Sequence, residues 1–211
     1  TIEVTGGTFN IDPSKYVTEA ALATKNENGT FGVKKAVLAK IGTTEYYTMD
    51  DAFKAVKTGE TIVLQRNYTI DKVQNSGDKS FTIDLNTYTW TYIGADPESA
   101  AFNINYANRT LTVKNGTVVS NSMIGLIPSA SSFTGTITYD NAGLVFENVN
   151  MNANGRSGFE TSGNNTNDAI TLIGGELHVY NGYGIYFAST GTLTIDGTKI
   201  FAKTMGVQVC S

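Results

Sequence analysis

The chain has 211 residues, of which 16% are charged and 22 are glycine, and its formal net charge is −4. An acidic chain without a basic stripe is not expected to bind nucleic acid, and no apolar run is long enough to span a bilayer. The single cysteine, Cys210, excludes an intrachain disulfide framework. The first residues lack the features of a signal peptide, and Thr1 is an unusual start, so we expect a processed chain or one unit of a longer polypeptide.

Residues 1–37 are predicted to form a separate unit that begins with half of a solenoid coil. Ile2, Val4 and Phe9 have the spacing of three apolar positions that recurs in later coils, and two glycines, Gly6-Gly7, lie where those coils turn. The segment therefore carries the pattern of a coil without the coils that would precede it.

The rest of this first unit is predicted to contain a helical turn and a β-hairpin. Asp12-Pro13 favours a helical turn that extends through Tyr16-Val17. Two short strands near 22–24 and 31–33 flank a loop at 26–30, and a loop of that composition between two strands is typical of a hairpin.

Residues 38–211 are predicted to form the solenoid, which begins with a cap. Thr48 is placed to cap a helix near 49–57, and Gly59 suits the left-handed residue that ends a helix. A strand at 61–65 follows. A helix over the end of the solenoid would hide strand edges that otherwise pair with other chains.

Five eight-residue segments align without gaps from the middle of the chain onward. They begin at Phe81, Leu111, Leu144, Ile170 and Leu193, and their eighth residues are Tyr88, Val118, Met151, Leu177 and Ile200. The first, third and eighth positions are always apolar, and the first and third alternate with outward residues as a strand requires. Asn or Gly at the fifth or sixth position indicates a turn between two strands.

A second set of apolar segments runs parallel to the first. These segments begin at Ala101, Gly125, Gly158, Gly184 and Gly206, and both sets lengthen between the same two coils. Three short strands per coil predict an all-β fold, a right-handed parallel β-helix. An antiparallel sandwich would also alternate, but it would not hold two sets at the same irregular spacing.

Polar residues are predicted to stack between coils. Asp84, Lys114 and Glu147 share the fourth position, and Glu176 and Lys199 form a second pair, so opposite charges would lie about 4.8 Å apart. Asn115 and Asn148 share a turn position and predict an asparagine ladder. Exposed ion pairs contribute only about 0–1 kcal/mol each to stability. We therefore expect these contacts to set the register between coils and to add little to the stability of the fold.

The end of the chain is predicted to continue into the beginning of another unit. Gly206–Ser211 followed by Thr1–Phe9 repeats the apolar pattern of 184–200. The expected assembly junction contains Ile2, Val4, Phe9, Val207, Val209 and Cys210. The expected partner is a copy of the same chain, either as a tandem repeat or as a separate subunit, because a head-to-tail contact that does not close makes a filament.

Two stretches resemble recurrent units of large bacterial cell-surface proteins. Gly6–Val17 together with Asn28–Val33 is similar to one such unit, and Ala39–Leu64 is similar to another. In those proteins both units flank pectin-lyase-like β-helices, often in tandem. The resemblance covers about the first third of the chain by motif and the rest by coil pattern, and it implies an extracellular or cell-surface location.

Pectin-lyase-like folds include polysaccharide lyases and glycosidases, but no catalytic, metal or cofactor residue is predicted here. The partial motif at Asn165–Asp168 lacks a Gly-His-Gly partner, and neither Arg109 nor Arg156 has an acidic cluster beside it in the alignment. His178 is the single histidine, and its column faces outward. The expected class is therefore a non-enzymatic structural module, with a polysaccharide-active enzyme as the least favoured alternative.

The other alternative is an adhesin or glycan-binding domain. Tyr180, Tyr183 and Tyr186 lie close together in sequence beside 152–168, which is predicted to be a polar insert, and aromatic rings with polar neighbours are typical of a sugar-binding surface. The segment 128–142 is the largest departure from coil length and is a candidate recognition loop. No residue in either segment identifies a ligand.

Overall fold

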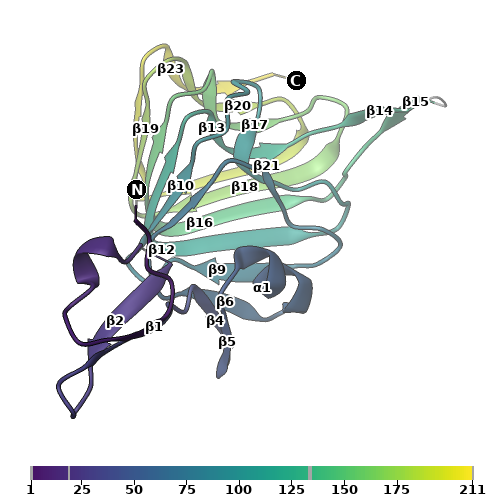
Figure 1. The fold of residues 1–211 in the computed structure, drawn as a ribbon. Helices are drawn as coiled ribbons and strands as arrows, with labels where there is room; N and C mark the ends of the chain where they lie inside the picture. Colours follow the sequence, from purple (N-terminus) through teal and green to yellow (C-terminus); the bar gives the residue numbers. More distant parts are fainter. Residues whose placement is uncertain (1, 19, 133–134, 211) are drawn as a thin grey trace.

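The computed structural model describes residues 2–18, 20–132 and 135–210 and contains a β-solenoid of about five turns with a small separate sheet at the N-terminal side (Figure 1). Parallel strands of successive coils stack along one axis, and the coil interior is filled by apolar side chains. The predicted parallel β-helix is therefore confirmed as a fold class.

The strands of the solenoid form three walls. The first wall contains β6 (Thr61–Leu64), β9 (Phe81–Asp84), β12 (Thr110–Ser120), β16 (Gly143–Ala153), β18 (Thr166–Ile173) and β21 (Thr190–Asp196). The second contains β7 (Tyr68–Ile70), β10 (Thr89–Tyr92), the later halves of β12 and β16, β19 (Glu176–Val179) and β22 (Lys199–Ala202). The third contains β8 (Gln74–Asn75), β11 (Ala100–Asn103), β13 (Met123–Ile127), β17 (Ser157–Thr161), β20 (Tyr183–Phe187) and β23 (Met205–Val209).

The register of the first wall matches the predicted alignment. Leu111 pairs with Phe81 and with Leu144, and the same column continues through Ile170 to Leu193. The predicted turn is confirmed as well, because the fifth-position residues Asn115, Asn148, Gly174 and Gly197 all have positive φ, between 54° and 70°.

The gap-free alignment is wrong at two places. In the second wall Trp90, and not Tyr88, pairs with Val118, because Asn86 and Thr87 both have positive φ and the turn there is two residues longer. In the third wall Gly125 pairs with Phe102 and Phe159, one position away from the predicted alignment.

The core carries a line of aromatic rings that joins two coils across the coil between them, because Trp90 and Phe102 belong to one coil and Phe146 and Phe159 to the coil two positions further along. Trp90 lies 5.0 Å from Phe102, which lies 6.0 Å from Phe146, which in turn lies 4.9 Å from Phe159, measured between ring centroids. Gly125 leaves room for this line, since a Cβ there would meet the Phe159 ring at 2.8 Å. The glycine is thus part of the core packing.

The polar stacks are present in part. Lys114 lies 3.8 Å from Asp84, and Lys199 lies 3.0 Å from Glu176. The Asn115 amide donates to the Asp84 carboxylate at 3.2 Å, so it bonds to an acid and not to a neighbouring asparagine. An asparagine pair forms instead at another corner, where Asn141 Nδ2 donates to Asn108 Oδ1 at 3.1 Å.

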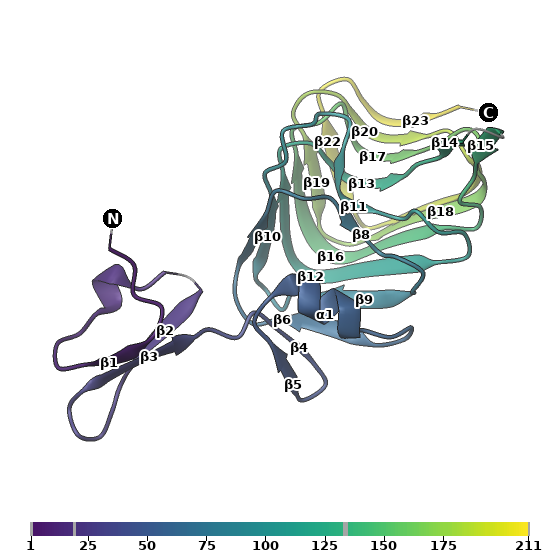
Figure 2. The ribbon, with the colours of Figure 1, turned by 45° about the vertical axis from the view of Figure 1, so that its right-hand side comes forward.

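The N-terminal end of the solenoid is closed by a hairpin and a helix (Figure 2). β4 (Ala39–Ile41) pairs antiparallel with β6 and with β5 (Thr44–Tyr46), so parallel stacking stops there. The helix α1 (Met49–Ala55) begins as predicted, with the Thr48 hydroxyl accepting the Asp51 N–H at 3.2 Å. It ends two residues earlier than predicted, and it buries Met49 and Ala52 while the Phe53 ring meets the Phe81 ring edge-on.

The N-terminal unit is a three-stranded antiparallel sheet. The predicted hairpin corresponds to β2 (Ala21–Lys25) and β3 (Phe31–Lys35), and the predicted helical turn is a single 3₁₀ turn at Ser14–Tyr16. β1 (Gly7–Phe9) pairs with β3 and gives the order β1-β3-β2. This unit and the last coil of the solenoid lie at opposite ends of the molecule (Figure 2).

Candidate functional site

The last coil leaves one edge of every wall unpaired in the part of the chain that the structure describes. β21 pairs with β18, β22 with β19 and β23 with β20, and each of the three is the last strand of its wall. Unpaired strand edges present free N–H and C=O groups that favour the addition of another strand.

The apolar interior is also open at this end. The Ile195 side chain is 39% exposed, while Leu172, its neighbour one coil earlier, is fully buried. Val209 is 65% exposed, while its neighbour Phe187 is 3% exposed. Four more residues of this coil are only partly buried against the core: Leu193, Ile200, Ala202 and Val207. We call this surface, formed by β21, β22 and β23, the open coil.

The predicted junction residues fall on two separate surfaces. Val207 and Val209 belong to the open coil, whereas Ile2, Val4 and Phe9 lie in the N-terminal unit. Ile2 is 70% exposed, and Val4 forms a parallel bridge with Val17. Thr1 and Ser211, which complete the predicted junction, lie outside the described residues.

Cys210 is half-buried beside the open coil. Its N–H donates to the carbonyl of Phe187 at 2.9 Å. A hydrogen bond involving the Cys210 thiol raises the pKa of the Tyr186 hydroxyl above its usual value. The cysteine therefore continues the strand pairing of the preceding coil and does not sit in the interior column.

The three tyrosines predicted as a ligand surface divide between two hollows. Tyr180 lies with His178 and Phe201 in a shallow hollow on the second wall, and its hydroxyl donates to Asn152 at 3.0 Å. Tyr183 and Tyr186 lie on the third wall with ring centroids 6.1 Å apart. Tyr180 and the pair of Tyr183 and Tyr186 thus line different hollows.

Tyr183 and Tyr186 share their hollow with an ion pair. The Arg156 guanidinium donates to both carboxylate oxygens of Glu160, at 3.0 and 2.7 Å, and also pairs with Glu98. The space between the two rings and this pair measures about 230 Å³. Aromatic faces beside a fixed charged pair can hold a polar ring-shaped ligand, and the sequence alone did not associate Arg156 with the tyrosines.

His178 faces outward as predicted and stacks on Phe201 with ring centroids 4.5 Å apart. Its Nε2 lies 3.2 Å from Glu176, and hydrogen bonds from His178 and Lys199 lower the pKa of the Glu176 carboxyl. No group of three or more metal-binding side chains occurs among the described residues. Nor does any helix in that part of the chain have the length and apolar character needed to cross a membrane.

The segment 128–142 contains a projecting hairpin of β14 (Ala130–Ser132) and β15 (Gly135–Ile137), visible at the side of the solenoid (Figure 1). Residues 133–134 lie outside the described part. The segment 152–168 is not an insert but an ordinary coil, because it contains β17, which pairs with strands on both sides.

Asn165 and Asp168 hold the base of this hairpin. The Asn165 amide nitrogen bonds to the Pro128 carbonyl and to Asp168, both at 3.0 Å, and its oxygen accepts the Tyr139 N–H. The Asp168 carboxylate also accepts the Ala142 N–H at 3.2 Å. Burial raises the pKa of Asp168, which has no exposed surface. The side chains of the partial motif at Asn165–Asp168 thus form hydrogen bonds at the base of the hairpin.

Replacing Asn165 with alanine is expected to raise the pKa of Asp168 further, because the hydrogen bond from Asn165 lowers it. A carboxyl with a raised pKa in the folded state binds a proton more tightly there, so its contribution to stability falls as pH rises through that pKa. The variant should lose about 1–3 kcal/mol at neutral pH and less in acid. NMR titration and urea unfolding measure both effects; equal losses for the exposed neighbour Asn164→Ala would contradict the prediction.

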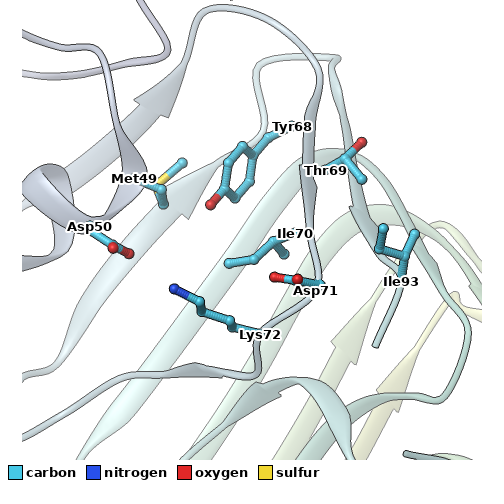
Figure 3. A pocket seen from close by; sticks show the side chains of 8 residues that line it. All are labelled: Met49, Asp50, Tyr68, Thr69, Ile70, Asp71, Lys72 and Ile93. Carbon is cyan, nitrogen blue, oxygen red and sulfur yellow. The ribbon is translucent and has the colours of Figure 1, made fainter. Parts of the chain in front are cut away.

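A further hollow lies between α1 and β7 (Figure 3). Met49 and Asp50 of the helix face Tyr68 of β7, and Lys72 extends between Asp50 and Asp71. Burial raises the pKa of Tyr68 to about 12, with a smaller contribution from the two aspartates. The hollow lies where the cap helix meets the solenoid, and Met49 is buried there.

No protein-family model matches this chain, and neither does any curated protein or solved structure. The fold is therefore known from its own geometry as a parallel β-solenoid that is closed at its N-terminal side and has unpaired strand edges in its last described coil. The likeness to pectin-lyase-like cell-surface repeats stays a resemblance in sequence.

Proposed function

We propose that this protein is a non-enzymatic structural module that builds an extracellular fibre or stalk by head-to-tail association of solenoid units at a bacterial surface. The difference between the two ends of the solenoid carries this proposal. The N-terminal end is closed by α1 and the β4–β5 hairpin, while the open coil exposes apolar columns and three strand edges.

One unit that carries a closed end and an open end favours a head-to-tail contact between different surfaces of neighbouring units. Two identical patches would make a closed dimer, whereas two different surfaces make a chain of units. The elements that every coil repeats are apolar interior columns and hydrogen-bonded corners, which agree with a structural role. The cell-surface location rests on the sequence resemblance described above.

The test measures association of the full chain over a range of concentrations by sedimentation and negative-stain microscopy. Wild-type protein should form thin filaments, and Ile195→Lys should weaken their formation by at least about 30-fold, the effect of losing one central apolar contact of about 2 kcal/mol. Thr194→Lys is the matched control, because Thr194 is exposed on the same strand and faces outward. Monomers at every concentration, or equal effects of both variants, would sink the proposal.

Glycan binding is the second candidate function, and the hollow beside Tyr183 and Tyr186 favours it. Two aromatic rings next to the Arg156–Glu160 pair provide stacking faces and hydrogen-bonding groups in one place. A glycan array with the wild-type chain and with Tyr183→Ala separates this function from fibre formation. Saccharide binding that is lost in the variant would favour an adhesin, and the absence of any bound saccharide would remove this candidate.

A further inference from the structure

The N-terminal unit has a free strand edge that complements the open coil. Among the described residues, β1 pairs with β3 on one side and has no partner on the other, and β22 likewise pairs only with β19. Each edge offers backbone groups to a parallel neighbour. The free edge of β1 and the free edge of β22 can therefore each pair with a parallel strand from another copy of the chain.

The side-chain pattern of residues 2–9 matches the open coil position by position. Ile2, Val4 and Phe9 have the same spacing as Leu193, Ile195 and Ile200, the interior residues of β21 and β22. Both segments have glycine at the fifth position; the positive φ falls at that position in the open coil, at Gly197, and one residue later in the N-terminal unit, at Gly7. If the segments stack in this register, the exposed Ile2 side chain would cover the partly buried Leu193.

The backbone direction of Val4 agrees with this register. In the solenoid, fourth-position carbonyls point toward the preceding coil: Lys114 accepts from Leu85 N–H at 2.8 Å, and Asp196 accepts from Gly174 N–H at 2.7 Å. Because backbone groups alternate sides along a strand, third-position residues point away from the preceding coil. Val4 stands at the third position, and its N–H donates to the Tyr16 carbonyl at 2.8 Å, which leaves the opposite edge open.

The backbone direction of Thr8 agrees as well. The Asn26 N–H donates to the Thr30 carbonyl, so alternate residues of β3, including Gly32, face β2. Phe31 then faces β1 and bonds with Phe9, and Thr8 is directed to the free edge. The corresponding residue of the open coil, Lys199, directs its N–H to the preceding coil in the same way.

The N-terminal unit cannot reach the open coil of its own chain. Residues 36–38, which join β3 to β4, span at most about 10 Å, whereas five coils rise by about 24 Å. The unit lies at the closed end of its own solenoid (Figure 2). The partner that fits is therefore a second copy.

We propose that residues 2–37 of one copy close the open coil of a second copy, with residues 2–5 adding to β21 and β1 adding to β22. This inference rests on the proposed function. β3 is antiparallel to β1, so parallel stacking ends there, as it does where β4 pairs with β6. The fibre then consists of separate solenoids, each closed at both ends, and not of one continuous β-helix.

A disulfide between two variants tests the register. In a Cys210→Ser background, the full-length Thr8→Cys and Lys199→Cys proteins are mixed under mild oxidation. Both positions are exposed, and facing residues of adjacent parallel strands lie within disulfide range. A mixed dimer should form between these two proteins. Glu176→Cys replaces Lys199→Cys in the control, because Glu176 occupies the same column one coil earlier and would lie too far from Thr8.

Val4→Glu supplies the second measurement, and it should reduce association at least about 30-fold by placing a charge against Ile195. If filaments persist in Val4→Glu and no disulfide forms between Thr8→Cys and Lys199→Cys, the open coil contacts a different surface of the neighbouring unit. That result overturns this inference and leaves association through the open coil intact. Wild-type protein that stays monomeric overturns both.

Discussion

Replacing Phe146 with alanine is expected to lower the free energy of unfolding by about 3–5 kcal/mol, the range for removing a large aromatic side chain from a packed core. Phe146 is 1% exposed and is the central ring between Phe102 and Phe159. Its loss would leave a cavity that the two remaining rings cannot fill without moving strands in three coils. Urea unfolding followed by circular dichroism measures the change.

The matched control is Val145→Ala, the adjacent residue on β16, whose side chain points outward and is only partly buried. Its loss should cost less than about 1 kcal/mol, because surface substitutions remove little packing. Similar losses in both variants would show that the aromatic line does not hold the coils together. A loss confined to Phe146→Ala supports a core whose rings join coils two positions apart.

Replacing Gly182 with alanine is expected to destabilise the fold by at least about 3 kcal/mol, more than a typical overpacked core site. A Cβ at Gly182 would collide with the backbone carbonyl of Arg156 in the preceding coil. The same carbonyl accepts the Tyr183 N–H at 2.9 Å, so the two backbones are held together at this corner. No side-chain rotation relieves the clash, because the obstacle is backbone.

Gly163→Ala is the control for this prediction. A Cβ there would meet its nearest neighbour, the Ala188 carbonyl oxygen, at 3.6 Å, which is an ordinary contact. Thermal unfolding of both variants separates close backbone approach from a general effect of removing glycine. A Gly182→Ala protein as stable as Gly163→Ala would mean that neighbouring coils can separate at this corner without cost.

Much of the solenoid was predictable from the sequence because each coil repeats the same pattern of interior apolar residues and turn residues. Leu111, Leu144 and Ile170 stack as predicted, since one apolar column must face the interior in every coil. The errors occurred where one coil departs from the repeat. Tyr88 was misplaced because Asn86 and Thr87 lengthen its turn, and a gap-free alignment has no means of recognising two extra residues.

The candidate sites were less predictable than the fold. Tyr180 was grouped with Tyr183 and Tyr186 because they are close in sequence, yet the corner at Gly182 places them on different walls. Arg156 was set aside for lack of an acidic cluster, whereas Glu98 and Glu160 both contact it. Contacts between coils join residues far apart in the chain, and spacing within one coil does not reveal them.

The sequence by itself determined the stacked-coil architecture, the turns between strands at Asn or Gly, and the helical cap. These features follow from apolar spacing, turn residues and helix-capping residues. Only the tertiary structure decided that the N-terminal side of the solenoid is closed and that the last described coil exposes strand edges and apolar columns. These properties depend on whether a strand such as β4 runs antiparallel to its neighbour and stops the stack, or whether the last coil ends with exposed columns such as that of Ile195. The direction of a strand and the burial of its side chains depend on the neighbouring strands, and these neighbours come from distant parts of the chain.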